Sequence, residues 1–249
     1  MEIAHDQHFL QDTSILEVII PAAELHKSDT VLEIGPGYGI LTKELAKKAA
    51  KVIAIEIDEQ FTEALSKYKK VELLIGNALD ILPQRDDFTK IVAAIPYQIC
   101  EPLMQYLCLA KQVELSVLIV PMKFALRVQQ HPLFSAFLTL EVIQEVPKEA
   151  FSPAPKVVSA VVKITPNKED RDDLFIIRKL YWQRTKKLKN GLRDTLIDFY
   201  ERKGKKPSKK EALDLILKMD FDDVLLETLI AKLPLERYGE IVGKVNGRV

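Results

Sequence analysis

The chain has 249 residues, with 36 Lys or Arg against 36 Asp or Glu, so it is long enough for one large domain or a domain with a smaller companion and carries no formal net charge. Its hydrophobic content of 47% is typical of a globular protein with a buried core, and the absence of a long apolar run excludes a membrane-spanning protein. Two cysteines favour a reducing, cytoplasmic setting, and with four scattered histidines they offer no metal-ligand spacing.

A glycine turn between a strand and a helix is the first strong feature along the chain. Residues 14–25 predict a helix, and the apolar run at 31–34 predicts a buried strand. Gly35, Gly37 and Gly39 follow, and residues 41–50 predict a helix that begins directly after them. This arrangement is typical of nucleotide sites, because glycine lets the backbone approach a ligand and the helix N-terminus favours polar groups.

The spacing of the glycines narrows the kind of ligand. A dinucleotide fingerprint needs a third glycine at position 40, where Ile40 stands. The pattern therefore favours a nucleoside without a pyrophosphate. A structural turn that binds no ligand is the alternative.

An acidic residue at the end of the second strand supports the nucleoside interpretation. Residues 51–58 predict a strand rich in β-branched side chains, and Glu56 lies near its end. In folds of this type a carboxylate about 20 residues after the first glycine accepts hydrogen bonds from ribose hydroxyls. The alternative is that Glu56 is a solvated acid at a strand end.

The following segments continue the alternation of strands and helices. The residues at 134–146 fit a helix and a strand equally well, and the two prolines in 151–159 exclude a helix there. The alternation predicts an α/β fold, with a parallel sheet and helices on both faces. The other predicted elements are a helix at 59–69, strands at 71–75 and 90–94, a helix at 102–110, a strand at 115–120, a helix at 123–130 and a strand at 160–164.

The composition changes near residues 165–170, and only helical segments follow, at 172–198, 209–217 and 221–233. We therefore expect two domains, at residues 1–167 and 168–249. Residues 178–210 hold thirteen Lys or Arg against three acids, so the neutral total conceals a basic region. Such a region is typical of a protein with a polyanionic partner, although a solvated face is the alternative.

Four motifs together resemble those of the small-subunit rRNA adenine N6,N6-dimethyltransferases, also called dimethyladenosine transferases. Residues 7–10 (QHFL) are similar to the family's N-terminal motif, and residues 32–42 resemble its glycine-rich cofactor motif. The proline loop at 151–159 and the basic segment 183–190 (QRTKKLKN) resemble the family's later motifs. The glycine motif alone would suit any class I methyltransferase, whereas the last two motifs are specific.

The resemblance implies a fold, an activity and a set of site residues. The fold would be a class I methyltransferase sheet, Rossmann-like, with helices on both faces, followed by a small C-terminal α-helical domain that binds RNA. The activity would be S-adenosylmethionine-dependent methylation of adenine N6 in small-subunit rRNA, on the immature small ribosomal subunit, without a metal or a membrane. The implied cofactor-binding residues are His8, Leu10, Gly35, Gly37, Glu56, Asn77 and Ala94; the implied catalytic residues are Ala94, Ile95, Pro96, Tyr97 and Phe151; and the implied RNA-binding residues are Lys186, Lys187, Lys189 and Arg193.

Several positions depart from the family pattern. The family has an aspartate at position 77, often an asparagine at position 8, and an asparagine at position 94, where this chain has Asn77, His8 and Ala94. The family asparagine at position 94 helps to hold the target amine, so Ala94 lacks one acceptor while the Ile95 carbonyl remains. Losing one preorganised contact at a reacting centre costs about 100-fold or more in rate.

Three hypotheses follow from these observations. The first is an active rRNA adenine dimethyltransferase. The second is a ribosome-assembly factor that binds RNA and keeps the methyltransferase fold but methylates slowly or not at all. The third is an unrelated oxidoreductase with a similar sheet, which Ile40 and the basic helical region disfavour.

Overall fold

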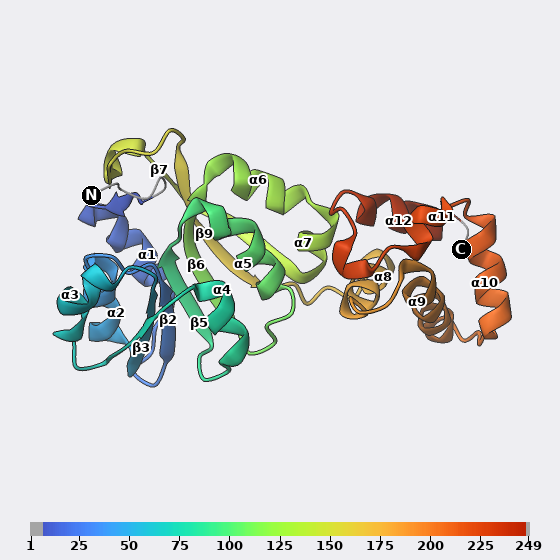
Figure 1. Cartoon of the computed structure of the whole chain (residues 1–249), viewed down its shortest axis with the longest axis horizontal. Helices are drawn as coiled ribbons and strands as arrows, with labels where there is room; N and C mark the ends of the chain where they lie inside the picture. Colours follow the sequence, from blue (N-terminus) through green and yellow to red (C-terminus); the bar gives the residue numbers. More distant parts are fainter. Residues whose placement is uncertain (1–6, 248–249) are drawn as a thin grey trace. The chain divides into compact units, whose positions relative to one another are not determined.

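The computed structural model describes residues 7–247, and the chain divides into two compact units (Figure 1). The sheet unit comprises the residues up to Gln129 together with Leu138–Pro166. The helical unit comprises Gln130–Phe137 and the chain from Asn167 onward. Residues 130–137 therefore belong to the helical unit, although they precede the last two strands of the sheet.

The sheet unit is built on seven strands in the order β4-β3-β2-β5-β6-β9-β7. The five strands from β4 to β6 pair in parallel, whereas β9 is antiparallel to both β6 and β7. The strands are β2 (Thr30–Ile34), β3 (Lys51–Glu56), β4 (Val71–Ile75), β5 (Lys90–Ala94), β6 (Leu115–Pro121), β7 (Leu138–Val146) and β9 (Ser159–Pro166).

The structure confirms the expected class I methyltransferase sheet, but the sheet is mixed where the sequence predicted a parallel one. Between β7 and β9 the chain has only a short 3-10 helix, a two-residue strand and the proline loop. Without a crossover helix to carry it back, the chain returns beside β7 in the opposite direction.

Helices cover both faces of this sheet. In Figure 1, α1 and α2 lie on one side of the strands and α4 and α5 on the other. Val31 and Val52 pack into the core beneath α1 and α2 with residues such as Leu45. The helices of this unit are α1 (Leu16–Ala22), α2 (Ile40–Lys48), α3 (Thr62–Ser66), α4 (Ala78–Ile81), α5 (Cys100–Leu107) and α6 (Met122–Gln130), and its 3-10 helices are η1 (Thr13–Ile15), η2 (Glu59–Phe61), η3 (Leu82–Gln84), η4 (Tyr97–Ile99) and η5 (Lys148–Ala150).

A separate two-stranded sheet joins the N-terminal motif to the proline loop. Strand β1 (Phe9–Leu10) pairs antiparallel with β8 (Phe151–Ser152), so that Leu10 faces Phe151 in register. Both side chains are buried and belong to the core beneath the sheet. Two motifs that lie about 140 residues apart in sequence are thus held side by side.

The helical unit contains α7 (Pro132–Phe137), α8 (Asp172–Trp182), α9 (Leu188–Arg202), α10 (Lys209–Lys218), α11 (Asp223–Glu227), η6 (Ile230–Lys232) and α12 (Arg237–Asn246). The segment predicted as one helix at 172–198 is two helices. Between these two helices, backbone carbonyls accept hydrogen bonds from a distant segment instead of from the next helical turn. The N–H groups of Ile230 and Ala231 donate to the carbonyls of Lys186 and Arg184. The sequence prediction also missed α12.

Arg178 connects three segments of the helical unit by hydrogen bonds. From α8, its guanidinium donates hydrogen bonds to the backbone carbonyls of Ala136 (2.5 Å), Asn167 (2.8 Å) and Glu169 (2.8 Å). The first carbonyl belongs to α7 and the others to the segment before α8. Arg178 was counted in the basic excess of the sequence, but its charge is directed at the protein's own backbone.

No helix among residues 7–247 is long and apolar enough to cross a bilayer.

Candidate active site

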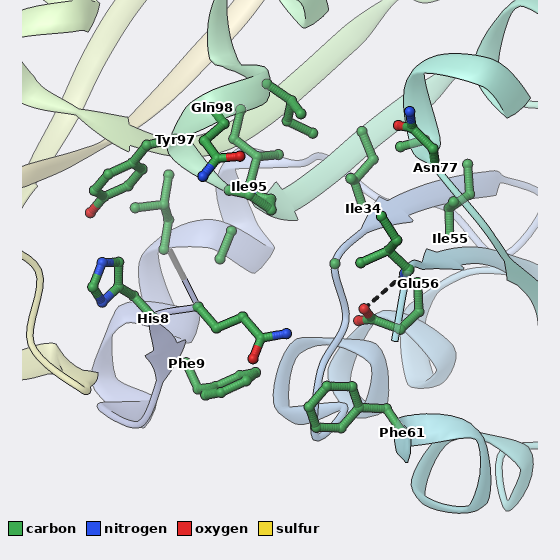
Figure 2. A pocket seen from close by; sticks show the side chains of 18 of the residues that line it. His8, Phe9, Ile34, Ile55, Glu56, Phe61, Asn77, Ile95, Tyr97 and Gln98 are labelled. Atoms are coloured by element: carbon green, nitrogen blue, oxygen red, sulfur yellow. Dashed lines mark hydrogen bonds between the residues drawn. The ribbon is translucent and has the colours of Figure 1, made fainter. Parts of the chain in front are cut away.

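A pocket of about 290 Å³ lies where the parallel strands β2, β3 and β5 end (Figure 2). Ligands of open α/β sheets bind at the carboxyl ends of the strands, where loops from several strands converge. Figure 2 shows Glu56 and Asn77 on one side of the pocket and His8, Tyr97 and Gln98 on the other. The apolar walls come from residues such as Ile34, Ile55, Ile57, Phe61 and Ile95.

The glycine turn after β2 adopts a backbone that favours glycine at each of its three glycine positions. Gly35, Gly37 and Gly39 have φ values of +65°, +51° and +78°. At Gly37 the requirement is also steric, since a Cβ would lie 2.9 Å from the ring of Phe9. Phe9 in turn packs edge-on against Tyr38 and Phe61, with ring centroids 5.0 and 5.5 Å apart. The N-terminal motif therefore lies directly on the turn.

Glu56, at the end of β3, is buried and holds the turn in place. Its Oε2 accepts from the N–H of Gly37 at 3.0 Å, and its Oε1 accepts from the N–H groups of Ile57 and Asp58 at 2.9 and 3.0 Å. A carboxylate offers about four lone-pair sites, so about one remains for a ligand hydroxyl. Glu56 is thus not a solvated strand-end acid, and one of its roles is structural.

A second acid, Glu33, is buried beneath the turn and was not singled out in the sequence. It is 1% exposed, and its Oε2 has no hydrogen-bond partner among the described residues. Burial raises the pKa of Glu33 to about 8, and the Glu56 carboxylate adds to the shift, while the neighbouring Thr42 opposes it. Glu33 lines a second pocket of about 410 Å³ that shares His8, Gly35 and Ala94 with the first.

The raised pKa of Glu33 predicts a pH-dependent stability. The unfolded chain ionises this carboxyl near 4.5, whereas the folded protein keeps it neutral up to about 8. The neutral Glu33 carboxyl therefore contributes its full stabilisation of the folded state below pH 4.5, and this contribution is lost as the pH rises toward 8. Between pH 5 and 8, wild type should lose about 3 to 5 kcal/mol of unfolding free energy relative to Glu33→Gln, measured by urea denaturation. Parallel pH profiles for the two proteins would show that the carboxyl ionises normally.

Asn77 begins the loop after β4 and caps a helix. Its Oδ1 accepts from the N–H of Leu79 at 3.0 Å, at the N-terminus of α4. The side chain also lines the pocket, opposite Tyr97. The Asn77 carbonyl is thus already engaged in a hydrogen bond, and a ligand that binds at this position must share it.

The segment from Ala94 to Tyr97 forms the wall where β5 ends. Ala94 and Tyr97 are partly buried, Ile95 is 3% exposed, and all three line the pocket with Pro96. The Tyr97 hydroxyl lies 2.6 Å from Oγ of Ser159, a fully buried side chain on β9. This hydrogen bond fixes the position of the tyrosine ring at the rim of the pocket.

His8 and Phe151 complete the wall beside Tyr97. His8 Nδ1 donates to the carbonyl of Pro153 at 2.8 Å, and its ring lies 5.8 Å from that of Tyr97. Phe151 lines the pocket but is only 6% exposed and packs within the core. The catalytic role that the family resemblance implies for Phe151 stays a prediction.

The structure brings nearly all of the predicted site residues together. His8, Gly35, Glu56, Asn77, Phe151 and the whole segment 94–97 line one pocket; Leu10 lines the neighbouring one, and Gly37 bonds to Glu56. Sequence reasoning did not select Glu33, which lies inside the glycine-rich motif, or Gln98, which directly follows the segment 94–97. A buried acid within an apolar strand was the available signal for Glu33.

The basic residues predicted to bind RNA lie at the start of α9 in the helical unit. Lys186 and Arg193 both bond to Asp194 at 2.7 Å, and Lys187 bonds to Glu227 at 2.6 Å. Lys189 is exposed and makes no salt bridge within the described chain. The three lysines are surface groups, so the ion pairs of Lys186 and Lys187 are weak and do not prevent contact with a polyanion.

Within residues 7–247, no group of three or more His, Cys, Asp or Glu side chains could hold a metal ion.

This sheet, with its glycine turn and its strand-end pocket, defines a class I methyltransferase. A family model described as "Ribosomal RNA adenine dimethylase" matches residues 2–214. The chain belongs to this family, which confirms the resemblance found in the sequence.

Named relatives and solved structures agree with this assignment. A "Probable ribosomal RNA small subunit methyltransferase A" of Pyrococcus abyssi is 37% identical over 204 residues, covering 76% of this chain and 74% of its own. Its counterpart in Methanopyrus kandleri is 31% identical and covers 96% of this chain and 90% of its own. A dimethyladenosine transferase from Plasmodium falciparum superposes with a TM-score of 0.63 at 25% identity, covering 97% of this chain and 98% of its own. The 23S rRNA methyltransferase ErmE shares the fold, with a TM-score of 0.57, 21% identity and coverage of 96% and 99%.

Proposed function

We propose that this protein methylates adenine N6 in small-subunit rRNA during ribosome biogenesis, with S-adenosylmethionine as methyl donor. The proposal rests on one pocket in a member of this family. Glu56 and Asn77, the residues suited to a nucleoside, form one wall of this pocket, which we call the nucleoside wall, and the Ala94–Tyr97 segment forms the opposite wall. The proposed substrate is the RNA of the immature small subunit, and a cytoplasmic location follows from that substrate.

The pocket fits the methyl donor by its chemistry. Isoleucines 34, 55 and 57 provide apolar surface for a base, Glu56 keeps about one acceptor site for a ribose hydroxyl, and the glycine turn leaves its backbone accessible. When bound, S-adenosylmethionine supplies an electrophilic methyl group: the adenine nitrogen takes the methyl carbon, the carbon–sulfur electron pair stays on sulfur, and the nitrogen releases one proton.

The protein's own residues position the other reactant. Tyr97, fixed through Ser159, offers an aromatic face at the rim where a base flipped out of its helix would enter. The exocyclic nitrogen of adenine is a poor nucleophile because its lone pair is delocalised into the ring. Hydrogen-bond acceptors that hold the amine favour its pyramidal form, and the Ile95 carbonyl is the acceptor left by the family pattern in this chain.

The direct test is transfer of labelled methyl groups from S-adenosylmethionine to small ribosomal subunits that lack the modification. We expect label in N6-methylated adenine of the small-subunit rRNA. Binding of the cofactor and the RNA without any transfer would contradict the proposal and indicate an assembly factor. Mapping the labelled nucleosides would also show how many methyl groups each adenine receives.

Replacing Glu56 tests the cofactor half of the site. Glu56→Ala should weaken S-adenosylmethionine binding about 10- to 100-fold, because a charge-assisted hydrogen bond is lost and the glycine turn loses its anchor. Isothermal titration calorimetry measures the effect. Glu56→Gln keeps the shape and one acceptor oxygen, so its loss should be smaller. An unchanged affinity for Glu56→Ala would show that the ribose is held elsewhere.

Neutralising the lysines at the start of α9 tests the RNA half. The triple variant Lys186→Gln, Lys187→Gln, Lys189→Gln should bind structured RNA more weakly and reduce the slope of log K against log salt by about 0.7 to 0.9 per lost contact. Fluorescence anisotropy over a salt series measures the slope. The matched control replaces three exposed lysines of the sheet unit, Lys48, Lys67 and Lys69, with glutamine. This control should keep the salt slope of the wild type. Equal slopes for all three proteins would mean that the basic segment is only a solvated face.

A further inference from the structure

The end of β5 lacks a side-chain acceptor at the place where the proposed reaction needs one. Ala94 ends this strand and lines the pocket, but its methyl group cannot accept a hydrogen bond. The Ile95 carbonyl alone would hold only one hydrogen of the target amine. Another side chain that reaches the same wall could supply the second acceptor.

Three carboxamides line the pocket within the described chain: Gln7, Asn77 and Gln98. Gln7 forms a hydrogen bond with Asp58, and the Asn77 carbonyl caps α4. Both carboxamides therefore already have hydrogen-bond partners within the protein. Gln98 is exposed at the rim and forms no side-chain hydrogen bond with the described residues.

Gln98 also lies on the correct wall. It follows Tyr97 directly in the short helix η4, four residues after Ala94. Figure 2 shows its carboxamide beside Tyr97 and Ile95, directed toward the pocket and across from Glu56 and Asn77. A base stacked on Tyr97 would present its edge to this group.

We propose that Gln98 is the side chain that holds the target adenine in this protein and replaces the acceptor that Ala94 lacks. This inference rests on the proposed function. Oε1 of Gln98 accepts from the exocyclic amine, and its Nε2 donates to the neighbouring ring nitrogen N1. Adenine presents this donor–acceptor pair on its Watson–Crick edge, so one carboxamide can hold the amine and the ring nitrogen together. The proton released on methylation passes to solvent at the exposed rim.

The test is a double-mutant cycle over positions 94 and 98, measured by single-turnover methyl transfer to unmodified small subunits. Gln98→Ala should lower the rate about 100-fold, while RNA and S-adenosylmethionine affinities stay within about threefold. In the Gln98→Ala background, Ala94→Asn should restore most of the lost rate, and this gain should exceed any change that Ala94→Asn causes when Gln98 is present. Gln98→Glu keeps the acceptor and loses the donor, so it should transfer faster than Gln98→Ala.

Each outcome separates this inference from the proposed function. Wild-type transfer with an unchanged rate in Gln98→Ala would overturn the role of Gln98 alone. A gain from Ala94→Asn that is equally large with and without Gln98 would show that the two side chains act independently, which also overturns it. No transfer by any member of the cycle, with both ligands bound, would overturn the proposed function and this inference with it. A merely structural role for Gln98 would not allow rescue from position 94.

Discussion

Replacing Tyr97 with alanine is expected to reduce methyl transfer at least about 1,000-fold, while S-adenosylmethionine binding changes little. Stacking of a base on an aromatic ring contributes about 1–3 kcal/mol, and a misplacement of about 1 Å costs a further factor of about 100. Tyr97 lies across the pocket from Glu56, so its loss affects the entering base and leaves the nucleoside wall intact. Single-turnover transfer and calorimetry with the same preparation measure the two effects.

Tyr97→Phe is the matched control for this experiment. It keeps the ring but removes the hydroxyl that bonds to Ser159, whose side chain is fully buried. We expect less than a tenfold loss of rate, with a stability cost of about 1–3 kcal/mol for the unpaired serine. Equal losses for Phe and Ala would assign the role to the hydroxyl, and near-normal transfer by Tyr97→Ala would contradict the stacking model.

Replacing Arg178 with methionine is expected to lower the unfolding free energy of the helical unit by about 3 kcal/mol or more. Three backbone carbonyls would lose a charged donor, and each such hydrogen bond contributes about 1.5–3 kcal/mol. Burial lowers the pKa of Arg178, against the opposing effect of Asp170 and its acidic neighbours. Trp182, the only tryptophan of the chain, lies at the end of α8 and reports denaturant unfolding of this unit.

Lys189→Met provides the contrast. Lys189 is exposed on the same unit and makes no salt bridge with the described residues, so its replacement should change stability by less than about 0.5 kcal/mol. It should weaken RNA binding, whereas Arg178→Met should not do so at temperatures where the unit is folded. The reverse pattern would show that Arg178 serves the RNA and that its backbone contacts are secondary.

The sheet was largely predictable because buried parallel strands have simple signals. Strands β4 and β5 have the predicted bounds, and β2 and β3 differ by one or two residues from the predicted ranges. Apolar β-branched runs separated by helical segments admit few alternatives. The pattern of apolar residues did not predict that β9 is antiparallel. Its direction follows from the connection between β7 and β9, which contains no crossover helix.

The helical unit was harder to predict because its boundaries are set by distant contacts. The apolar segment 134–146 contains both the end of α7 and the whole of β7, and its residue pattern fits either structure. The break between α8 and α9 arises where the backbone of residues 184–188 bonds to the backbone of residues 228–231. No local signal marks that pairing, since helix propensity is high on both sides of it.

Much of the candidate site followed from motifs, but the partners of its residues did not. Sequence reasoning placed Glu56 near a ribose, while its three backbone donors appear only in three dimensions. The same holds for the carbonyl of Asn77 and the hydroxyl of Tyr97, which are engaged by Leu79 and Ser159. A motif specifies the identity of a side chain, whereas the fold determines how much of its bonding capacity is left for a ligand.

The position of α7 constrains how such proteins can recombine. Its side chains Leu133, Phe134 and Ala136 are buried, and the helix packs against α8 and α12, although its codons lie before those of β7 and β9. A chimera that joins the first 167 residues of one relative to the helices of another would pair α7 of one parent with α8 and α12 of the other. Exchange of the helical unit between relatives therefore requires three crossovers, one on each side of residues 130–137 and one near residue 167, or else the joint evolution of both faces of this packing.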